Sequence, residues 1–202
     1  MDAQSKPDTA SSVVIWRRKL DNKSFEICRF IRSRIGFQLS GTILAVHENQ
    51  PIEIYYQTFC NFDWKTREVI IKQRNGFVES SLKLSVNGGT WNHAERGPLP
   101  ELAHCIDVDI ELTPATNALP INRLKLVVGE SVEIRAAWIR VPTLSVIAAR
   151  QRYDRLSENT YLYTSLASGF QAEIDVDQYG LPVRYGDIWD RVVPAVVAPD
   201  GS

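Results

Sequence analysis

Two pairs of aspartates have the spacing that comes nearest to a catalytic carboxylate pair. Asp107 and Asp109, and likewise Asp175 and Asp177, stand two residues apart in segments that alternate apolar and polar side chains. On a β-strand this spacing puts both carboxylates of a pair on one face, which a glycoside hydrolase could use if the pair lay in a cleft. The intervening valines favour a solvated sheet face, or pairing with nearby arginines, over catalysis.

Other catalytic or metal-binding patterns are weaker still. The nearest approach to a metal site combines His93 with the adjacent residues His104 and Cys105, but neighbours on a strand point to opposite faces. The chain has no Gly-x-Ser-x-Gly turn and no glycine-rich phosphate loop. Its cysteines, Cys28, Cys60 and Cys105, are odd in number and widely spaced, so we expect free thiols. We also expect no metal, no cofactor and no enzymatic activity.

Residues 113–123, TPATNALPINR, concentrate hydrogen-bonding side chains beside two prolines. The prolines interrupt a strand, while Thr116, Asn117 and Arg123 can donate or accept hydrogen bonds. The arginine offers a planar fork for a carboxylate or phosphate, and the asparagine offers a donor and an acceptor to sugar hydroxyls. A structural loop that satisfies its own backbone and a ligand head-group site fit this segment about equally well.

Several aromatic residues could line a ligand groove. Most of the five tryptophans and seven tyrosines occur in strand-like segments and are expected in the core. Tyr153, Tyr161 and Tyr163 place phenols on one face at strand spacing, which suits an acyl chain or a sugar as readily as a packed sheet. We expect these three tyrosines and Trp64 to line a groove.

Composition and charge exclude several classes of partner. The 202 residues carry 23 Lys+Arg and 24 Asp+Glu, a net charge of -1, so no excess charge attracts nucleic acid or an anionic membrane. No stretch is apolar enough for a secretory signal or a membrane span, and we therefore expect a cytoplasmic protein. The polar ends, residues 1–12 and 194–202, are expected to be disordered on either side of a single domain, residues 13–193.

The elements that must position these residues are β-strands. Period-two alternation dominates the chain, as in FEICRFIR at 25–32, and turn signals such as Asn-Gly-Gly at 87–89 separate the alternating runs. Residues 147–156 are the best helical candidate and suit a strand as well. So many hairpins predict an all-β, or nearly all-β, fold: a large curved antiparallel sheet that forms a barrel or half-barrel.

Three segments together resemble one known family. They are SVVIWRRKLD near the N-terminus, CNFDWKTREVII further on and, most strongly, DVDIELTPATNALPINRLKL in mid-chain, and with supporting pieces they extend over about residues 13–191. They look like the bacterial putative glycolipid-binding family. The resemblance implies a half-barrel similar to that of bacterial lipoprotein carriers and a glycolipid-binding role. Asn61, Asn122 and Gly186 stand where that family usually has an acidic residue, an arginine and a proline.

We therefore expect a non-enzymatic binding protein that holds an apolar or amphiphilic ligand, lipid-like or glycolipid-like, in the concave face of a curved sheet. Asn117, Arg123 and Arg67 are expected near the polar end of its groove. Arg123 either anchors such a ligand or pairs internally with Asp107 or Asp109. Two other functions stay open: a glycoside hydrolase that uses the aspartate pairs, and a scaffold whose concave face or free edge binds a protein. The sequence assigns no oligomeric state.

Overall fold

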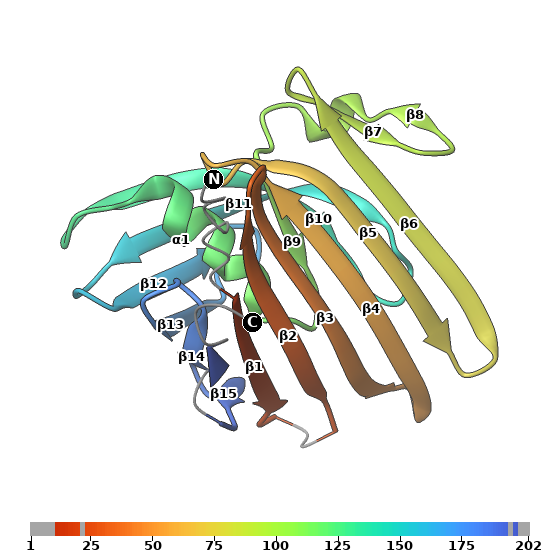
Figure 1. Cartoon of the computed structure of the whole chain (residues 1–202), viewed down its shortest axis with the longest axis horizontal. Helices are drawn as coiled ribbons and strands as arrows, with labels where there is room; N and C mark the ends of the chain where they lie inside the picture. Colours follow the sequence, from red (N-terminus) through yellow and green to blue (C-terminus); the bar gives the residue numbers. More distant parts are fainter. Residues whose placement is uncertain (1–10, 21–22, 194–195, 198–202) are drawn as a thin grey trace, which may run out of the picture.

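The chain forms one large curved β-sheet (Figure 1). The computed structural model describes residues 11–20, 23–193 and 196–197. Strands make up 60% and helices 7% of it, and the sheet does not close on itself. The expected fold, a nearly all-β chain with a large curved antiparallel sheet, is confirmed.

The described residues form sixteen strands and three short helical segments. The strands are β1 (Ser11–Arg18), β2 (Phe25–Ser33), β3 (Gly36–His47), β4 (Gln50–Cys60), β5 (Thr66–Asn75), β6 (Val78–Asn87), β7 (Thr90–His93), β8 (Gly97–Pro98), β9 (Asp107–Ile110), β10 (Ser131–Ile139), β11 (Val146–Arg155), β12 (Thr160–Ser165), β13 (Gln171–Val176), β14 (Pro182–Tyr185), β15 (Trp189–Arg191) and β16 (Val196–Val197). The helical segments are the 3-10 helices η1 (Pro100–Leu102) and η2 (Ala115–Asn117) and the α-helix α1 (Ala118–Leu124).

Neighbouring strands in sequence are mostly neighbours in the sheet. The order is β8-β7-β6-β5-β4-β3-β2-β1-β15-β14-β13-β12-β11-β10-β9, with β16 beside β1. Within the described residues every pairing is antiparallel except that of β9 with β10. The sheet curves until β9 reaches β5, where the Val108 N–H donates to Thr66 Oγ1 (3.2 Å) and the Thr66 N–H donates to Ile106 O (3.3 Å). These bonds bring the two regions together without forming a ladder.

Two hydrophobic clusters fill most of the interior. The larger packs against β1–β6, β9 and β10, and it contains fully buried side chains such as Ile54 and Leu84. The smaller packs against β10–β13 and contains Ile121 and Tyr153. Helix α1 lies between them, because its Leu119 belongs to the larger cluster and its Ile121 to the smaller.

The segment expected to be a loop folds instead as η2 followed by α1, within the curve of the sheet (Figure 1). Pro120 occupies the first turn of α1, where the backbone needs no intrahelical N–H donor. Lys125 adopts the left-handed conformation, with φ 49°, and ends the helix. A helix of seven residues is too short to be stable alone, so burial of Leu119 and Ile121 stabilises it. Local sequence pattern does not report that burial.

Described strands lie on both sides of the expected domain bounds, residues 13–193. Strand β1 begins at Ser11, two residues before the expected start of the domain, and β16 lies beyond its expected end. Residues 1–10, 194–195 and 198–202 of the two terminal segments expected to be disordered lie outside the described residues, as do residues 21–22.

Two further observations concern the cysteines and the helices. All three cysteines are buried and free, as the odd number and wide spacing predict. No helix in the described part of the chain is long and apolar enough to cross a membrane.

Candidate ligand-binding site

A cleft of about 710 Å³ opens at one end of the curved sheet. Its lining residues come from the ends of strands: Arg18 is the last residue of β1, Ser165 the last of β12, Tyr185 the last of β14 and Trp189 the first of β15. Because these strand ends lie at the same end of the sheet, strands that are far apart in sequence share a single opening. The cleft therefore depends on the curvature that brings β1, β9–β12, β14 and β15 together.

One wall of the cleft is apolar. In the ladder between β10 and β11, Trp138 lies opposite Ile147, and Ala136 lies opposite Ala149. The other apolar side chains of the lining come from the loop after β12 and from the end near β15, and they are Leu166, Ala167, Phe170, Ile188 and Trp189. Ile147 is 45% exposed and forms part of the rim. Such a wall suits a hydrocarbon chain.

The other end of the cleft is polar and centres on Asp109. Its Oδ2 accepts a hydrogen bond from Gln151 Nε2 (2.6 Å), and its Oδ1 accepts one from Thr116 Oγ1 (3.2 Å). The Tyr153 hydroxyl donates to Asn117 Oδ1 (2.8 Å), which fixes the amide beside the cleft. These bonds hold a carboxyl, two amides and phenols in one place, and each retains capacity for further hydrogen bonds.

The electrostatics of the polar end are those of a desolvated site. Burial raises the pKa of the Asp109 carboxyl, while the hydrogen bonds from Gln151 and Thr116 act in the opposite direction. Burial also raises the pKa values of the Tyr153 and Tyr163 phenols, and the negative charge of Asp109 adds to that shift. The phenols are therefore neutral hydrogen-bonding groups at physiological pH.

The structure places four of the residues predicted from the sequence around this polar end. Asn117 and Tyr163 line the cleft directly. Tyr153 donates a hydrogen bond to Asn117, and Thr116 donates one to Asp109. Thr116 also accepts a hydrogen bond from the backbone N–H of Ile110 (3.3 Å), so it joins η2 to the end of β9.

Arg123 pairs internally with Asp107, which is one of the two roles expected for it from the sequence. Its Nη2 lies 2.6 Å from Asp107 Oδ2, and its Nε donates to Asp107 Oδ1 at 2.9 Å. The Asp107 side chain is 0% exposed and that of Arg123 is 14% exposed. Burial raises the pKa of Asp107, and Arg123 opposes that shift. The pair ties α1 to β9.

The other three predicted residues lie away from the cleft. Trp64 is buried in the larger cluster, where its ring stacks on Phe37 at 4.0 Å between centroids. Arg67 is exposed on β5. Tyr161 is buried in the smaller cluster under the guanidinium of Arg155, 5.5 Å from its ring centroid. Their assignment to a ligand remains a prediction without support from this geometry.

Sequence reasoning missed the polar anchor Gln151 and the apolar wall of Trp138, Ile147 and Ala149. A signal was present, because Ile147, Ala149, Gln151 and Tyr153 follow a period of two. The same stretch was also the best helical candidate, and helical spacing does not place these side chains on one face.

A buried carboxyl lies directly behind the cleft. Glu26 Oε1 accepts hydrogen bonds from the Tyr56 hydroxyl (2.5 Å) and from the hydroxyl of Thr113 (2.8 Å), a cleft residue. Gly41 leaves room for the Tyr56 ring, since a Cβ at Gly41 would lie 2.5 Å from it. Glu26 Oε2 has no hydrogen-bond partner among the described residues, and burial raises the pKa of this carboxyl to about 8. Glu26 thus links the packed core to the cleft through Thr113.

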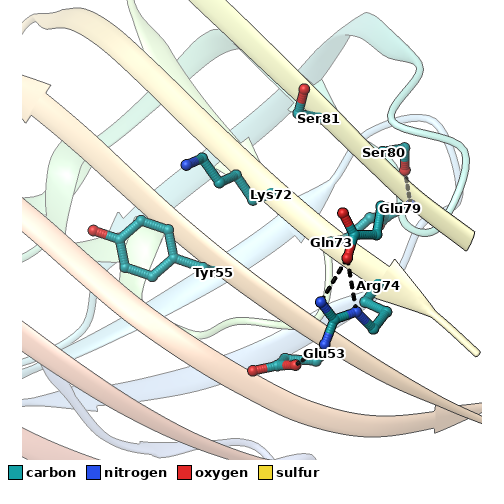
Figure 2. A pocket seen from close by; sticks show the side chains of 8 residues that line it. All are labelled: Glu53, Tyr55, Lys72, Gln73, Arg74, Glu79, Ser80 and Ser81. Carbon is teal, nitrogen blue, oxygen red and sulfur yellow. Dashed lines mark hydrogen bonds and ion pairs between the residues drawn. The ribbon is translucent and has the colours of Figure 1, made fainter. Parts of the chain in front are cut away.

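A second hollow of about 490 Å³ lies on the face of β4–β6 opposite the core (Figure 2). It is lined by Glu53, Tyr55, Lys72, Gln73, Arg74, Glu79, Ser80 and Ser81. Arg74 Nε donates to Glu79 Oε1 (3.0 Å), and Arg74 Nη1 lies 3.9 Å from Glu53 Oε2. Apart from Tyr55 the lining is polar or charged, and Arg74 pairs with both glutamates. This hollow has no wall for an apolar ligand.

The aspartate pairs are engaged in structural contacts. Asp107 and Asp109 are held as described above, Asp175 accepts from Arg184 Nε (2.9 Å), and Asp177 lies 2.9 Å from Arg191 Nη1. No group of three or more His, Cys, Asp or Glu side chains in the described ranges is arranged to hold a metal ion. The chemistry that the cleft offers is binding through hydrogen bonds and apolar contact.

Two solved structures resemble this one. The crystal structure of a DUF1089 family protein from Pseudomonas aeruginosa is 33% identical in sequence, with a TM-score of 0.78, and the match covers 84% of this chain and 92% of that one. A beta-barrel-like protein of the domain of unknown function DUF1849 from Brucella abortus is 9% identical, with a TM-score of 0.55 and coverage of 94% and 98%, and it shares the fold alone. No curated protein matches the sequence.

The family relationship follows from the sequence match. The model of the family described as "Putative glycolipid-binding" matches residues 13–191, which is nearly the whole of the sheet. The relative from Pseudomonas aeruginosa exceeds 30% identity over most of its own length. This chain belongs to the putative glycolipid-binding family.

Proposed function

We propose that this protein binds one amphiphile at a time without catalysis, and that its ligand is a glycolipid. The acyl chain lies along the wall formed by Trp138, Ile147 and Ala149, and the sugar lies beside Asp109 and Asn117. The observation that carries the proposal is the cleft itself, in which an apolar wall and a polar end share one opening. The family's description supports a ligand of this class.

The size and lining of the cleft suit a ligand of this kind. Its volume of about 710 Å³ lies within the range of about 300 to 1,000 Å³ typical of small-molecule sites. Carboxyl, amide and phenol groups are suitable partners for sugar hydroxyls, and aromatic rings such as Trp138 and Tyr163 offer flat apolar faces.

The state of the carboxyl groups favours binding over hydrolysis. A glycoside hydrolase needs two carboxyls on either side of the scissile bond, one of them available as a general acid. Here Asp107 is locked to Arg123, and Asp109 accepts hydrogen bonds from Thr116 and Gln151. Absence of catalysis and a cytoplasmic location are parts of this proposal, the first testable with chromogenic glycosides and the second by cell fractionation.

Titration with dodecyl maltoside below its micelle concentration tests the proposed function. Trp138 and Trp189 line the cleft, so binding should change the tryptophan fluorescence and saturate at one ligand per chain. Ala149→Phe places a ring in the cleft and should abolish the change. Ala94→Phe adds the same ring at an exposed turn between β7 and β8 and should leave binding intact.

Two results would contradict the proposal. One is an unchanged fluorescence signal with wild-type protein across several chain lengths of alkyl glycoside. The other is binding that survives Ala149→Phe with undiminished affinity, because the ligand would then lie elsewhere.

A further inference from the structure

The polar end of the cleft has a distinctive charge distribution. Its hydrogen-bonding groups come from Asp109, Asn117, Gln151 and Tyr163, and none of these is a cation. A site for a phosphate or carboxylate ligand normally presents arginine or lysine to it. Here the charged group at the centre is a carboxyl.

The cations among the described lining residues are Arg18 and Arg150. Arg150 is next to Gln151 on β11, so its side chain points to the opposite face of the strand, where its Nη2 lies 2.8 Å from Glu133 Oε2. Its side chain is 65% exposed. Arg18 is half-buried at the end of β1 and already takes part in an interaction of its own. Neither belongs to the hydrogen-bonded group around Asp109.

We infer that the cleft selects its ligand by head-group charge: it accepts an uncharged head group rich in hydroxyls, excludes a phosphate, and owes this preference to Asp109. This inference rests on the proposed function, because it requires an amphiphile in the cleft. It adds a chemical class of head group and the residue that determines it.

Hydrogen bonding and charge both support this selection. Thr116 and Gln151 donate hydrogen bonds to Asp109 and so favour its ionised form, in opposition to the burial that raises its pKa. An ionised carboxylate has about four acceptor positions, and these two donors use two of them. Sugar hydroxyls can donate to the remaining positions, and they can also accept from the amides of Asn117 and Gln151. A dianionic phosphate has no proton to donate and carries the same sign of charge as Asp109. Asp109 is partly buried, so the repulsion is screened less than it would be at an exposed site.

Three amphiphiles with the same dodecyl chain test the inference: dodecyl maltoside, dodecyl phosphate and dodecyltrimethylammonium. Each is titrated by calorimetry below its micelle concentration at neutral pH. We expect wild-type protein to bind the maltoside at least about tenfold more tightly than the phosphate. Asp109→Asn keeps the shape of the side chain and should reduce this ratio by about fivefold or more, mainly through tighter phosphate binding.

The matched control is Asp175→Asn, which removes a carboxylate paired with Arg184 outside the cleft and should leave the ratio unchanged. If Asp109→Asn does not fold, the three wild-type affinities still decide whether the cleft selects against the phosphate.

The possible results separate the inference from the function on which it rests. Equal affinity for maltoside and phosphate in wild-type protein, or an unchanged ratio in folded Asp109→Asn, would overturn the inference and leave amphiphile binding standing. Tightest binding of the trimethylammonium compound would also overturn it, by showing a cation site. Binding of none of the three would overturn the proposed function and the inference together.

Discussion

Two halves of the sheet share the same alternating strand pattern but differ in how their inner faces are filled. The packed half contains β1–β6, and the open half contains β9–β12. In β4, Ile52, Ile54 and Tyr56 point inward and are at most 2% exposed, because the larger cluster packs tightly against them. In β11, Ile147, Ala149 and Gln151 also share a face, but Ile147 is 45% exposed and the cleft lies over them. Alternation thus establishes that a segment is a strand, whereas the side chains opposite it decide whether its inner face is filled.

The comparison has a physical basis in side-chain size. The packed half faces large aliphatic and aromatic residues, while the open half carries alanines on β10 and β11 and polar groups toward α1. Small and polar side chains leave space that large ones would fill. The packed half therefore stabilises the fold, and the open half contains the cleft.

Loss of the ion pair that ties α1 to β9 should have the largest effect on stability. Arg123→Ala leaves the fully buried Asp107 without its partner, and we expect the free energy of unfolding to fall by about 3 to 5 kcal/mol. Urea denaturation measures the change. The loss should be smaller at acid pH, where protonation of Asp107 relieves the buried charge.

The matched control for this substitution is Arg184→Ala, which breaks a partly exposed pair with Asp175 and should cost less than about 1 kcal/mol. Similar losses for the two substitutions would mean that burial gives the Arg123–Asp107 pair no special role in holding α1.

One pair of identical substitutions compares the halves directly. Ile54→Ala removes a 0% exposed side chain from the packed half and should cost about 3 kcal/mol. Ile147→Ala at the rim of the cleft should cost less than about 1 kcal/mol but weaken dodecyl maltoside binding. Equal destabilisation, measured by urea midpoints, would show that the open half is as tightly packed as the other.

Glu26, which connects the packed half to Thr113, should make stability depend on pH. Its pKa in the folded protein is raised from 4.5 to about 8, so the folded chain retains a proton that the unfolded chain releases. The stability that this group contributes is fully present below its unfolded pKa of 4.5, and it is lost as the pH rises through its folded pKa of about 8.

Between about pH 6 and 8 we expect wild-type protein to lose about 2 kcal/mol of stability through this group. Glu26→Gln should remove that part of the slope, which urea denaturation at several pH values measures. Parallel slopes for the two proteins would contradict a proton held on Glu26.

A single hydrogen bond at the polar end of the cleft should have a small effect on stability. Tyr153→Phe keeps the ring but removes the hydroxyl that donates to Asn117, and it should cost about 1 kcal/mol. Tyr55→Phe, at a 40% exposed position on the opposite face, should change nothing measurable in the same thermal or urea assay. A neutral result for Tyr153→Phe would remove the hydrogen bond as the reason for the position of Asn117.

The sequence predicts the strands well and the site only in part. Period-two alternation and hairpin turns are local signals, and they are sufficient for the curved antiparallel sheet. Asn117 was predicted as a ligand residue because its segment concentrates hydrogen-bonding side chains beside two prolines, and Tyr163 because strand spacing puts it on one face with Tyr153 and Tyr161; both line the cleft. Trp64 and Arg67 could not be placed by such signals, since curvature of the sheet decides which strand ends meet. The helical fold of η2 and α1 likewise depends on tertiary burial.

The position of the bound alkyl chain tests the central claim most directly. A dodecyl maltoside with bromine in its chain quenches tryptophans that it contacts, and it can be compared in wild-type protein, Trp138→Phe and Trp64→Phe. Trp138 lines the cleft, whereas Trp64 is 9% exposed and stacked within the packed half. We expect wild-type protein and Trp64→Phe to be quenched alike, and Trp138→Phe to lose much of the quenching. Quenching that disappears in Trp64→Phe and persists in Trp138→Phe would place the ligand in the packed half and contradict this account.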